Sequence, residues 1–178
     1  MNWPASPRRV RELADEFYES LYRYAFRLAG TADRAENLTQ ETFCRAQMQW
    51  RQLRDPERPK PWLFAILRNC FLRELRDQRT ARHIPLEAAD DLYDAPDQSS
   101  FQEITGEAIQ AALNSLPEAF RTPVILFYFE EFTYRDIADQ MNVPIGTVMS
   151  RLARAKAHLR KQLESQLTGD MAGEHRGL

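Results

Sequence analysis

The sequence predicts an all-α protein made of two small helical domains joined by a flexible acidic linker. Only six of its 178 residues are glycine, and the helix-favouring residues Ala, Leu, Arg, Glu and Gln are abundant. Apolar residues recur at spacings of three, four and seven, and no run of alternating β-branched residues indicates a sheet. The apolar fraction of 43% is enough for globular packing, although each domain would have a modest core.

The N-terminal domain, residues 10–83, begins with two predicted helices. An amphipathic stripe predicts a helix over residues 11–29, and Gly30 follows where such a helix would end. A second stripe predicts a helix over residues 33–48, and Thr31 is placed to cap it. The polar positions of this second helix form a partly acidic surface, which by itself indicates only exposure to solvent.

A loop and a third helix complete this domain. Residues 51–61 contain three prolines and six charged residues, which predicts a surface loop. Residues 62–79 are strongly helical, and their polar arc contains Arg68, Asn69, Arg73 and Arg76. Cations and an amide beside an aromatic-bearing loop suit single-stranded DNA, whose bases stack on rings. A solvated basic helix explains the composition equally well.

Residues 84–100 have low hydrophobicity, clustered Asp and no periodicity, and are predicted to be the linker. The charge distribution supports this division. Residues 1–84 carry a net charge of +5, residues 85–118 carry −8 with no basic side chain, and residues 119–178 carry +1. The overall charge of −2 therefore does not argue against nucleic-acid binding, because basic domains flank an acidic connector.

The C-terminal domain, residues 101–165, is predicted to start with two helices, at about 101–114 and 119–132. Pro123 fits the second helix only near its first turn, which leaves that boundary uncertain. Residues 169–178 are predicted to be a frayed tail.

Residues 133–161 are predicted to form a helix-turn-helix. Thr133 can cap the first helix, with Asp136 near the positive end of the helix dipole. Asn142 tolerates a left-handed backbone, and Pro144 favours the start of a new helix. A short helix, a tight turn and a longer helix with small polar and Arg residues near its start are typical of this DNA-binding motif.

The second helix of this motif has two faces. Its apolar positions are Val148, Leu152, Ala155 and Leu159, and its polar positions are Thr147, Ser150, Arg151, Arg154 and His158. Between Ile145 and Lys161 there are five basic residues and no acidic one, which suits phosphates. Thr and Ser can bond base edges, and Arg can bind guanine with two hydrogen bonds. A helical hairpin with a solvated basic face is the alternative interpretation.

The composition argues against several other classes of protein. Cys44 and Cys70 are the only cysteines, and neither has a Cys or His at metal-ligand spacing, so both are expected to pack as small apolar groups. The three histidines form no catalytic constellation. We therefore expect neither an enzyme nor a cofactor or metal. No apolar run is long enough for a membrane span, and no secretory signal begins the sequence, which favours the cytoplasm.

Five blocks of the sequence, in this order, resemble the extracytoplasmic-function sigma factors of the sigma-70 family. The blocks are LYRYAFRL (21–28), AENLTQETFCRA (35–46), PWLFAILRN (61–69), ALNSLPEAFR (112–121) and TYRDIADQMNVPIGTVMSRLARAKAHL (133–159). The resemblance implies a dissociable subunit that binds core RNA polymerase and promoter DNA, and that directs initiation in a stress or signal response. Its acidic linker would pass through the polymerase interior.

The resemblance also implies roles for individual residues. The polymerase clamp would be contacted by Glu36, Asn37, Leu38, Thr39, Gln40 and Glu41. The melted minus-ten element would be held by the loop at 51–61 with Trp62, Arg68, Asn69, Arg73 and Arg76. The duplex minus-thirty-five element would be read by Thr147, Ser150, Arg151 and Arg154, with Arg135 and Lys156 as candidates for phosphate contacts.

Three residues depart from the family pattern. An acidic residue is usual at Asn37, Asp is frequent at Arg73, and Gly is usual at Asn142. The first departure leaves open whether a modification activates the clamp site, and the second leaves the minus-ten preference open. The family also implies control by an anti-sigma protein. The competing interpretations are a stand-alone helix-turn-helix regulator and a helical adaptor that does not bind DNA.

Overall fold

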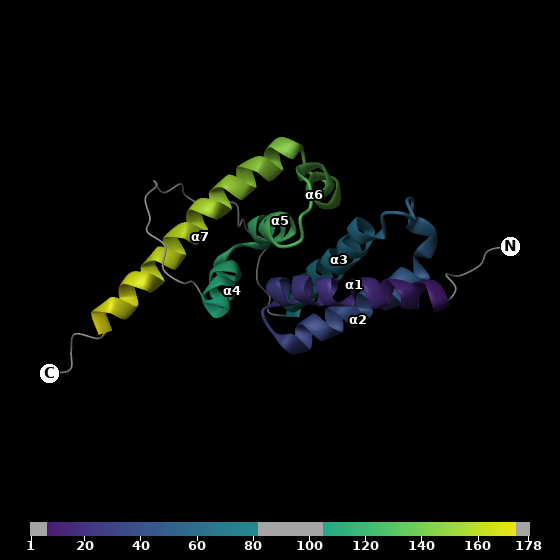
Figure 1. Cartoon of the computed structure of the whole chain (residues 1–178), viewed down its shortest axis with the longest axis horizontal. Helices are drawn as coiled ribbons and strands as arrows, with labels where there is room; N and C mark the ends of the chain where they lie inside the picture. The colour runs from purple at the N-terminus through teal and green to yellow at the C-terminus, as the bar shows by residue number, and fades with distance from the viewer. Residues whose placement is uncertain (1–6, 82–104, 174–178) are drawn as a thin grey trace. The chain divides into compact units, whose positions relative to one another are not determined.

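The all-α prediction is confirmed. The computed structural model describes residues 7–81 and 105–173, and these residues form seven α-helices and one short 3-10 helix without a strand (Figure 1). The chain divides into two compact units, Met1–Glu87 and Ala88–Leu178. The predicted linker lies outside the described residues. Within the described ranges, no helix is long and apolar enough to cross a membrane.

The N-terminal unit contains three mutually packed helices, α1 (Pro7–Ala29), α2 (Ala32–Met48) and α3 (Pro59–Ala81), with the 3-10 helix η1 (Trp50–Gln52) between the last two. Gly30 ends α1 as predicted, because its φ of 80° turns the chain while its N–H donates to the Phe26 carbonyl at 2.8 Å. Tyr24 and Phe64 stack at 4.9 Å in the centre of the unit, where both are fully buried. This stacking joins α1 to α3.

Three details of this unit differ from the prediction. Helix α1 begins at Pro7, four residues before the predicted start at residue 11. Helix α3 begins at Pro59, inside the predicted loop, since proline is tolerated in a first helical turn where its missing N–H has no partner to lose. Thr31 is the residue before α2 as expected, but its side chain makes no capping hydrogen bond.

The C-terminal unit contains α4 (Gly106–Ser115), α5 (Glu118–Tyr128), α6 (Tyr134–Met141) and α7 (Ile145–Gly173), and α7 packs on each of the other three. The Arg121 guanidinium fixes the short turn between α4 and α5 by donating to the carbonyls of Asn114 and Leu116, both at 2.8 Å. The core centres on large, fully buried side chains of four segments: Leu113, Leu116, Phe120, Ile125, Leu126 and Ile137.

The predicted ends of α4, α5 and α7 require correction. Thr105 caps α4 by accepting from the Ala108 N–H at 3.2 Å, so the helix starts later than residue 101. Pro123 lies in the interior of α5, and the helix continues past it to Tyr128 because the proline and its neighbours Val124 and Ile125 are buried in the core. Helix α7 extends to Gly173, through residues expected to fray.

Candidate functional site

The first helix of the predicted helix-turn-helix has reciprocal hydrogen bonds at its N-terminus. The Thr133 hydroxyl accepts from the Asp136 N–H at 3.1 Å, and one Asp136 carboxylate oxygen accepts from the Thr133 N–H at 3.3 Å and from its hydroxyl at 2.6 Å. This is a capping box, which fixes where α6 begins. The predicted cap is therefore confirmed, and Asp136 contributes more than its charge.

The turn between α6 and α7 also has the predicted backbone. Asn142 is left-handed, with φ 53° and ψ 49°, and the following Val143 N–H donates to the Ala138 carbonyl at 3.1 Å. The N–H groups of Thr147 and Val148 then bond the Pro144 carbonyl, which starts α7. Asn is one of the few residues other than glycine that adopts this conformation readily. The usual glycine is thus not required here.

The facing sides of the two helices are apolar. Ile137, Ala138 and Met141 of α6 are buried, as are Val148, Leu152 and Ala155 of α7. Tyr134, predicted for the same stripe, is 39% exposed and instead stacks on Phe127 of α5 at 4.9 Å. Packing on three sides holds α7 in one orientation relative to α4, α5 and α6.

The predicted DNA-binding residues lie on the outer surface of this motif. Ser150, Arg154 and Lys156 of α7 and Arg135 of α6 are exposed, while Thr147 and Arg151 are half-buried. Among the described residues, none of these four cations has a carboxylate within ion-pair distance. His158 differs, because its ring lies 3.1 Å from the Ser115 hydroxyl of α4 and so helps to join two helices.

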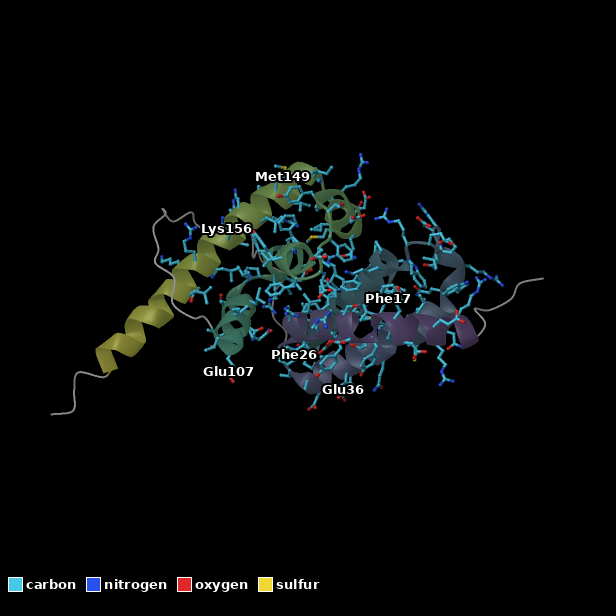
Figure 2. All side chains as sticks on the ribbon, viewed as in Figure 1. Phe17, Phe26, Glu36, Glu107, Met149 and Lys156 are labelled. Carbon is cyan, nitrogen blue, oxygen red and sulfur yellow. The ribbon has the colours of Figure 1, made fainter. Side chains whose placement is uncertain are left out.

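Helix α2 presents most of the residues predicted to contact the polymerase clamp. Glu36, Asn37 and Gln40 are exposed and Glu41 is half-buried, and Figure 2 shows Glu36 on the side of α2 away from α1 and α3. Leu38 and Thr39 are 3% and 0% exposed, and the Thr39 hydroxyl donates to the Ala35 carbonyl at 2.7 Å. These two residues therefore anchor the helix, and its outer surface is formed by their neighbours.

Aromatic and polar residues predicted for the minus-ten element gather on α3 and on the segment before it. Trp62 is half-buried and packs edge-on against Trp50 of η1 at 6.1 Å, and the Arg9 guanidinium lies 5.9 Å from the Trp50 ring. Asn69 and Arg76 are exposed, and Arg68 and Arg73 are half-buried. Trp50 was not among the predicted residues, although a tryptophan beside a proline-rich loop is itself a signal for base stacking.

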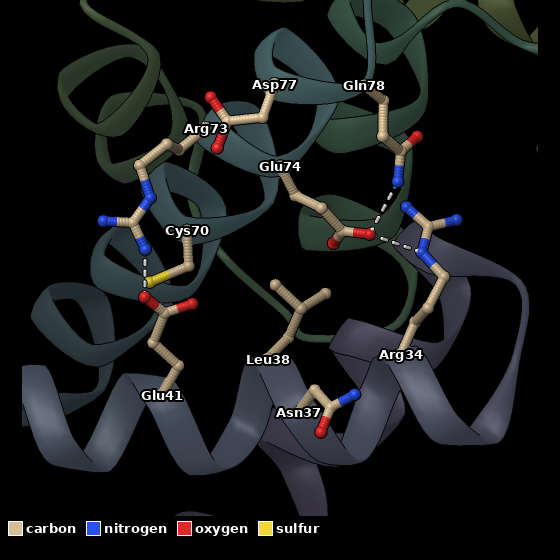
Figure 3. A pocket seen from close by; sticks show the side chains of 9 residues that line it. All are labelled: Arg34, Asn37, Leu38, Glu41, Cys70, Arg73, Glu74, Asp77 and Gln78. Atoms are coloured by element: carbon tan, nitrogen blue, oxygen red, sulfur yellow. Dashed lines mark hydrogen bonds and ion pairs between the residues drawn. The ribbon is translucent and has the colours of Figure 1, made fainter. Parts of the chain in front are cut away.

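A pocket of about 310 Å³ lies between α2 and α3 and joins two of the predicted sites (Figure 3). Arg73, from the minus-ten set, donates to the Glu41 carboxylate, from the clamp set. Glu41 also accepts from Arg45 at 2.9 Å. At the other side of the pocket, Glu74 accepts from Arg34 at 2.8 Å and from Gln78 at 2.9 Å. Neither this pocket nor the roles of Arg34 and Glu74 were predicted.

The two cysteines have different surroundings. Cys70 is buried and lines the α2–α3 pocket, and burial, followed by the nearby Glu41 charge, raises its pKa to about 11. Cys44 is exposed, so the prediction that both cysteines pack inside is wrong for Cys44. The outer surface of α2 has room for this small side chain without packing around it.

Comparison with known proteins identifies related sequences for both units. The family described as sigma-70 region 2 matches residues 13–81, and the family described as sigma-70, region 4, matches residues 106–159. The ECF RNA polymerase sigma factor SigL of Mycobacterium tuberculosis is 34% identical over 160 residues, which cover 87% of this chain and 89% of SigL. SigE of Mycolicibacterium smegmatis is 36% identical, over 85% of this chain but only 60% of SigE.

A solved structure is also similar. The sigma factor RpoE, in complex with the anti-sigma factor NepR from Bartonella quintana, superposes with a TM-score of 0.69 and is 27% identical. The superposition covers 86% of this chain and 98% of RpoE. The similarity therefore extends from the sequence to the helical fold.

Proposed function

Because the chain belongs to the extracytoplasmic-function (ECF) sigma factors of RNA polymerase, we propose that it selects promoters with one DNA-reading surface in each unit. Residues 10–83 would bind core polymerase and the minus-ten element, and residues 101–165 would bind the minus-thirty-five element. Residues 84–100 would connect them. The observation that carries this proposal is the capped helix-turn-helix, whose surface carries four cations that pair with no carboxylate of residues 7–81 or 105–173.

The start of α7 enters the major groove in this proposal. Ser150 and Arg154 are exposed, and half-buried Thr147 and Arg151 lie beside them. Side chains of these types bond base edges, and Arg can contact guanine through two hydrogen bonds. Lys156, further along α7, and Arg135, on α6, would contact phosphates and set the orientation of the motif.

The melted minus-ten strand would lie on α3 and the segment before it. The Trp50–Trp62 pair offers ring surfaces next to the loop, and an unstacked base can stack on such rings. Asn69 and Arg76 are exposed along α3, and Arg68 is half-buried between them and the loop. Arg73 would join them once its ion pair with Glu41 opens.

The exposed side of α2 is the proposed contact with the polymerase clamp. Glu36, Asn37, Gln40 and Glu41 form this contact surface, and buried Leu38 and Thr39 hold it in place from within. Asn37 supplies an amide where the family usually has a carboxylate, so one contact would be a neutral hydrogen bond. Charge-assisted hydrogen bonds are about twice as strong as neutral ones.

A second partner is suggested by the solved relative, which was crystallised with an anti-sigma factor. We propose that a protein of this class covers α2 of this chain and so competes with core polymerase. The sigma factor and polymerase would work together in the cytoplasm.

The decisive experiment is abortive initiation by core RNA polymerase from the host, with and without the chain, on a pool of genomic promoter fragments. The chain should yield sequence-selective products, and the double variant Arg151→Ala, Arg154→Ala should lose them. The control is Lys161→Ala, which removes an exposed cation of the same helix that is not among the proposed contacts. This variant should keep the products. Co-elution with core polymerase, tested in parallel, separates loss of binding from loss of promoter recognition.

The outcomes discriminate between the functions considered. Core binding without initiation would indicate that an activating event at the Asn37 surface is missing. A folded chain that never binds core polymerase, yet binds a palindromic duplex tightly by itself, would overturn the proposal in favour of a stand-alone regulator.

A further inference from the structure

We propose that Ile145 and Met149 read the 5-methyl groups of thymines in the minus-thirty-five duplex. This inference rests on the proposed function and adds an apolar component to its base recognition. The predicted contacts of α7 were all polar or charged, whereas these two large apolar side chains are 42% and 53% exposed. Figure 2 shows Met149 close to the start of α7 and Lys156 further along the same helix.

The core of the unit leaves about half of each of these two residues exposed. Residues four apart in a helix share one side, so Ile145 and Met149 form a continuous strip. The core-facing positions next to them are already filled by Val148 and Leu152, which are 0% and 6% exposed. Leaving both side chains in water forgoes the stabilisation that burial of a large apolar group would provide. A surface that closes over them would recover it.

The surroundings of this apolar strip indicate which kind of surface that is. Between Ile145 and Lys161 every charged side chain is basic, which favours a polyanion over the apolar surface of a protein. The strip lies at the N-terminal end of the second helix of the motif, the part that contacts base edges in helix-turn-helix proteins. The only methyl group displayed in the major groove belongs to thymine. A duplex with thymines at this position therefore fits both the charge and the apolar side chains.

The glycine at position 146, next to Ile145 and four residues before Ser150, is an independent observation that supports close contact with DNA. Apart from its chain neighbours and the backbone of its own helix, a Cβ added to Gly146 would meet no atom of the described residues within 4 Å, so packing does not require glycine there. Gly146 also lacks the positive φ that favours glycine over other residues. A bare backbone at this point allows DNA to approach α7 closely, which brings the side chains of Ile145 and Met149 within reach of the groove floor.

The test replaces single thymines of the selected minus-thirty-five element with uracil, which removes only the methyl group. With the full chain bound to core polymerase, uracil at one or two positions should lower the rate of initiation at limiting holoenzyme by about fourfold, the effect of losing one buried methyl contact. Met149→Ala and Ile145→Ala should abolish this discrimination, and Met149→Leu should retain it. Met48→Ala, which changes an 83% exposed methionine in the other unit, should leave it unchanged.

A second measurement does not depend on modified bases. Gly146→Ala should reduce promoter-dependent initiation while the melting temperature stays level or rises. Gly106→Ala is the matched control, because Gly106 is also helical and a Cβ there would also meet no atom within 4 Å. The control should change neither the melting temperature by more than a few degrees nor the rate of initiation.

Several results would overturn the inference while leaving the proposed function intact. The inference is wrong if the rate of initiation stays the same when uracil replaces each thymine of the minus-thirty-five element. It is also wrong if the selected element contains no thymine. Alanine variants that lose activity equally on thymine and uracil would assign the strip to a protein contact. Failure of the proposed function would look different, because no promoter would then be used at all.

Discussion

The cations of the two proposed DNA-binding surfaces are held in different ways. On α3, Arg73 donates to Glu41 of α2. On α7, Arg154 and Lys156 are exposed, and within the described part of the chain no carboxylate pairs with them. The proposed C-terminal surface therefore has cations that no described carboxylate occupies, whereas Arg73 of the proposed N-terminal surface is already paired with Glu41.

This difference matches the two states of DNA that the units are proposed to bind. Duplex DNA is always present, so a surface that reads it gains from cations that are already free. The melted strand appears only after polymerase has bound, and Glu41 lies on the surface proposed to contact polymerase. Binding of the clamp to Glu41 would then release Arg73 when the single strand becomes available.

The largest expected effect concerns the pocket between the paired helices. If the ion pairs keep α2 and α3 together, Cys70 stays buried and its pKa stays raised to about 11. Because the thiolate is the reactive form, Cys70 should then react with a maleimide about 100-fold more slowly than an ordinary thiol below pH 9. The rate is measured by mass spectrometry in a Cys44→Ser variant. Equal reactivity of Cys70 and Cys44 in the parent chain would show that the pocket opens freely.

The same pKa shift predicts how stability depends on pH. Because burial favours the neutral thiol, the folded protein holds this proton more tightly than the unfolded chain does. The resulting stability is fully present below pH 9 and is lost as the pH rises to about 11. Replacing Cys70 with alanine should remove this part of the pH dependence.

The second prediction compares one cation from each surface. Lys156→Ala should weaken holoenzyme binding to a duplex minus-thirty-five fragment about tenfold and lower the slope of log affinity against log salt by about one, since a phosphate contact is lost. Arg73→Ala should leave both quantities unchanged on the same fragment. Fluorescence anisotropy over a salt series provides the measurement, and equal losses for the two variants would remove the distinction between the surfaces.

The third prediction compares two threonines that precede helices. Thr133 caps α6 through its hydroxyl, whereas the Thr31 side chain makes no capping bond to α2. Thr133→Ala should therefore lower the free energy of unfolding by about 1 kcal/mol, and Thr31→Ala by only a few tenths. Urea denaturation followed by circular dichroism measures both. A larger loss for Thr31→Ala would show that local capping does not stabilise the C-terminal unit more than the N-terminal one.

The C-terminal motif was more predictable from sequence than the N-terminal surface for a physical reason. The cap at Thr133, the left-handed Asn142 and the start of α7 depend on residues within a few positions of one another. The ion pair between Arg73 and Glu41 joins residues 32 apart, and it exists only because α2 packs on α3. Local chemistry is visible in a sequence, whereas pairing across a helix interface depends on the packing of the whole unit.

The burial of two residues of α2 was not predicted, for a related reason. The resemblance implies one site for the whole block from Glu36 to Glu41. Six consecutive helical residues turn through a full circle, so some of their side chains must face inward. Leu38 and Thr39 do so. Sequence also could not show the exposed strip of Ile145 and Met149, because apolar residues are expected in a core until the structure shows the core to be full.

The smallest expected effect would test the release of Arg73 directly. In the free chain, Glu41→Gln should raise affinity for a single-stranded minus-ten oligonucleotide about two- to threefold, because a partly exposed ion pair contributes less than about 1 kcal/mol. Glu36→Gln removes the same charge from the exposed side of the same helix and is the matched control.

A double-mutant cycle isolates the contribution of the pair, since removing a carboxylate also weakens general repulsion of DNA. If Glu41 restrains Arg73, then Arg73→Ala should eliminate the gain caused by Glu41→Gln and should leave the smaller gain caused by Glu36→Gln intact. Additive effects in both backgrounds would contradict this. Arg73 would then be a structural partner of Glu41, and the N-terminal surface would bind the melted strand through Arg68, Asn69 and Arg76 without a contribution from Arg73.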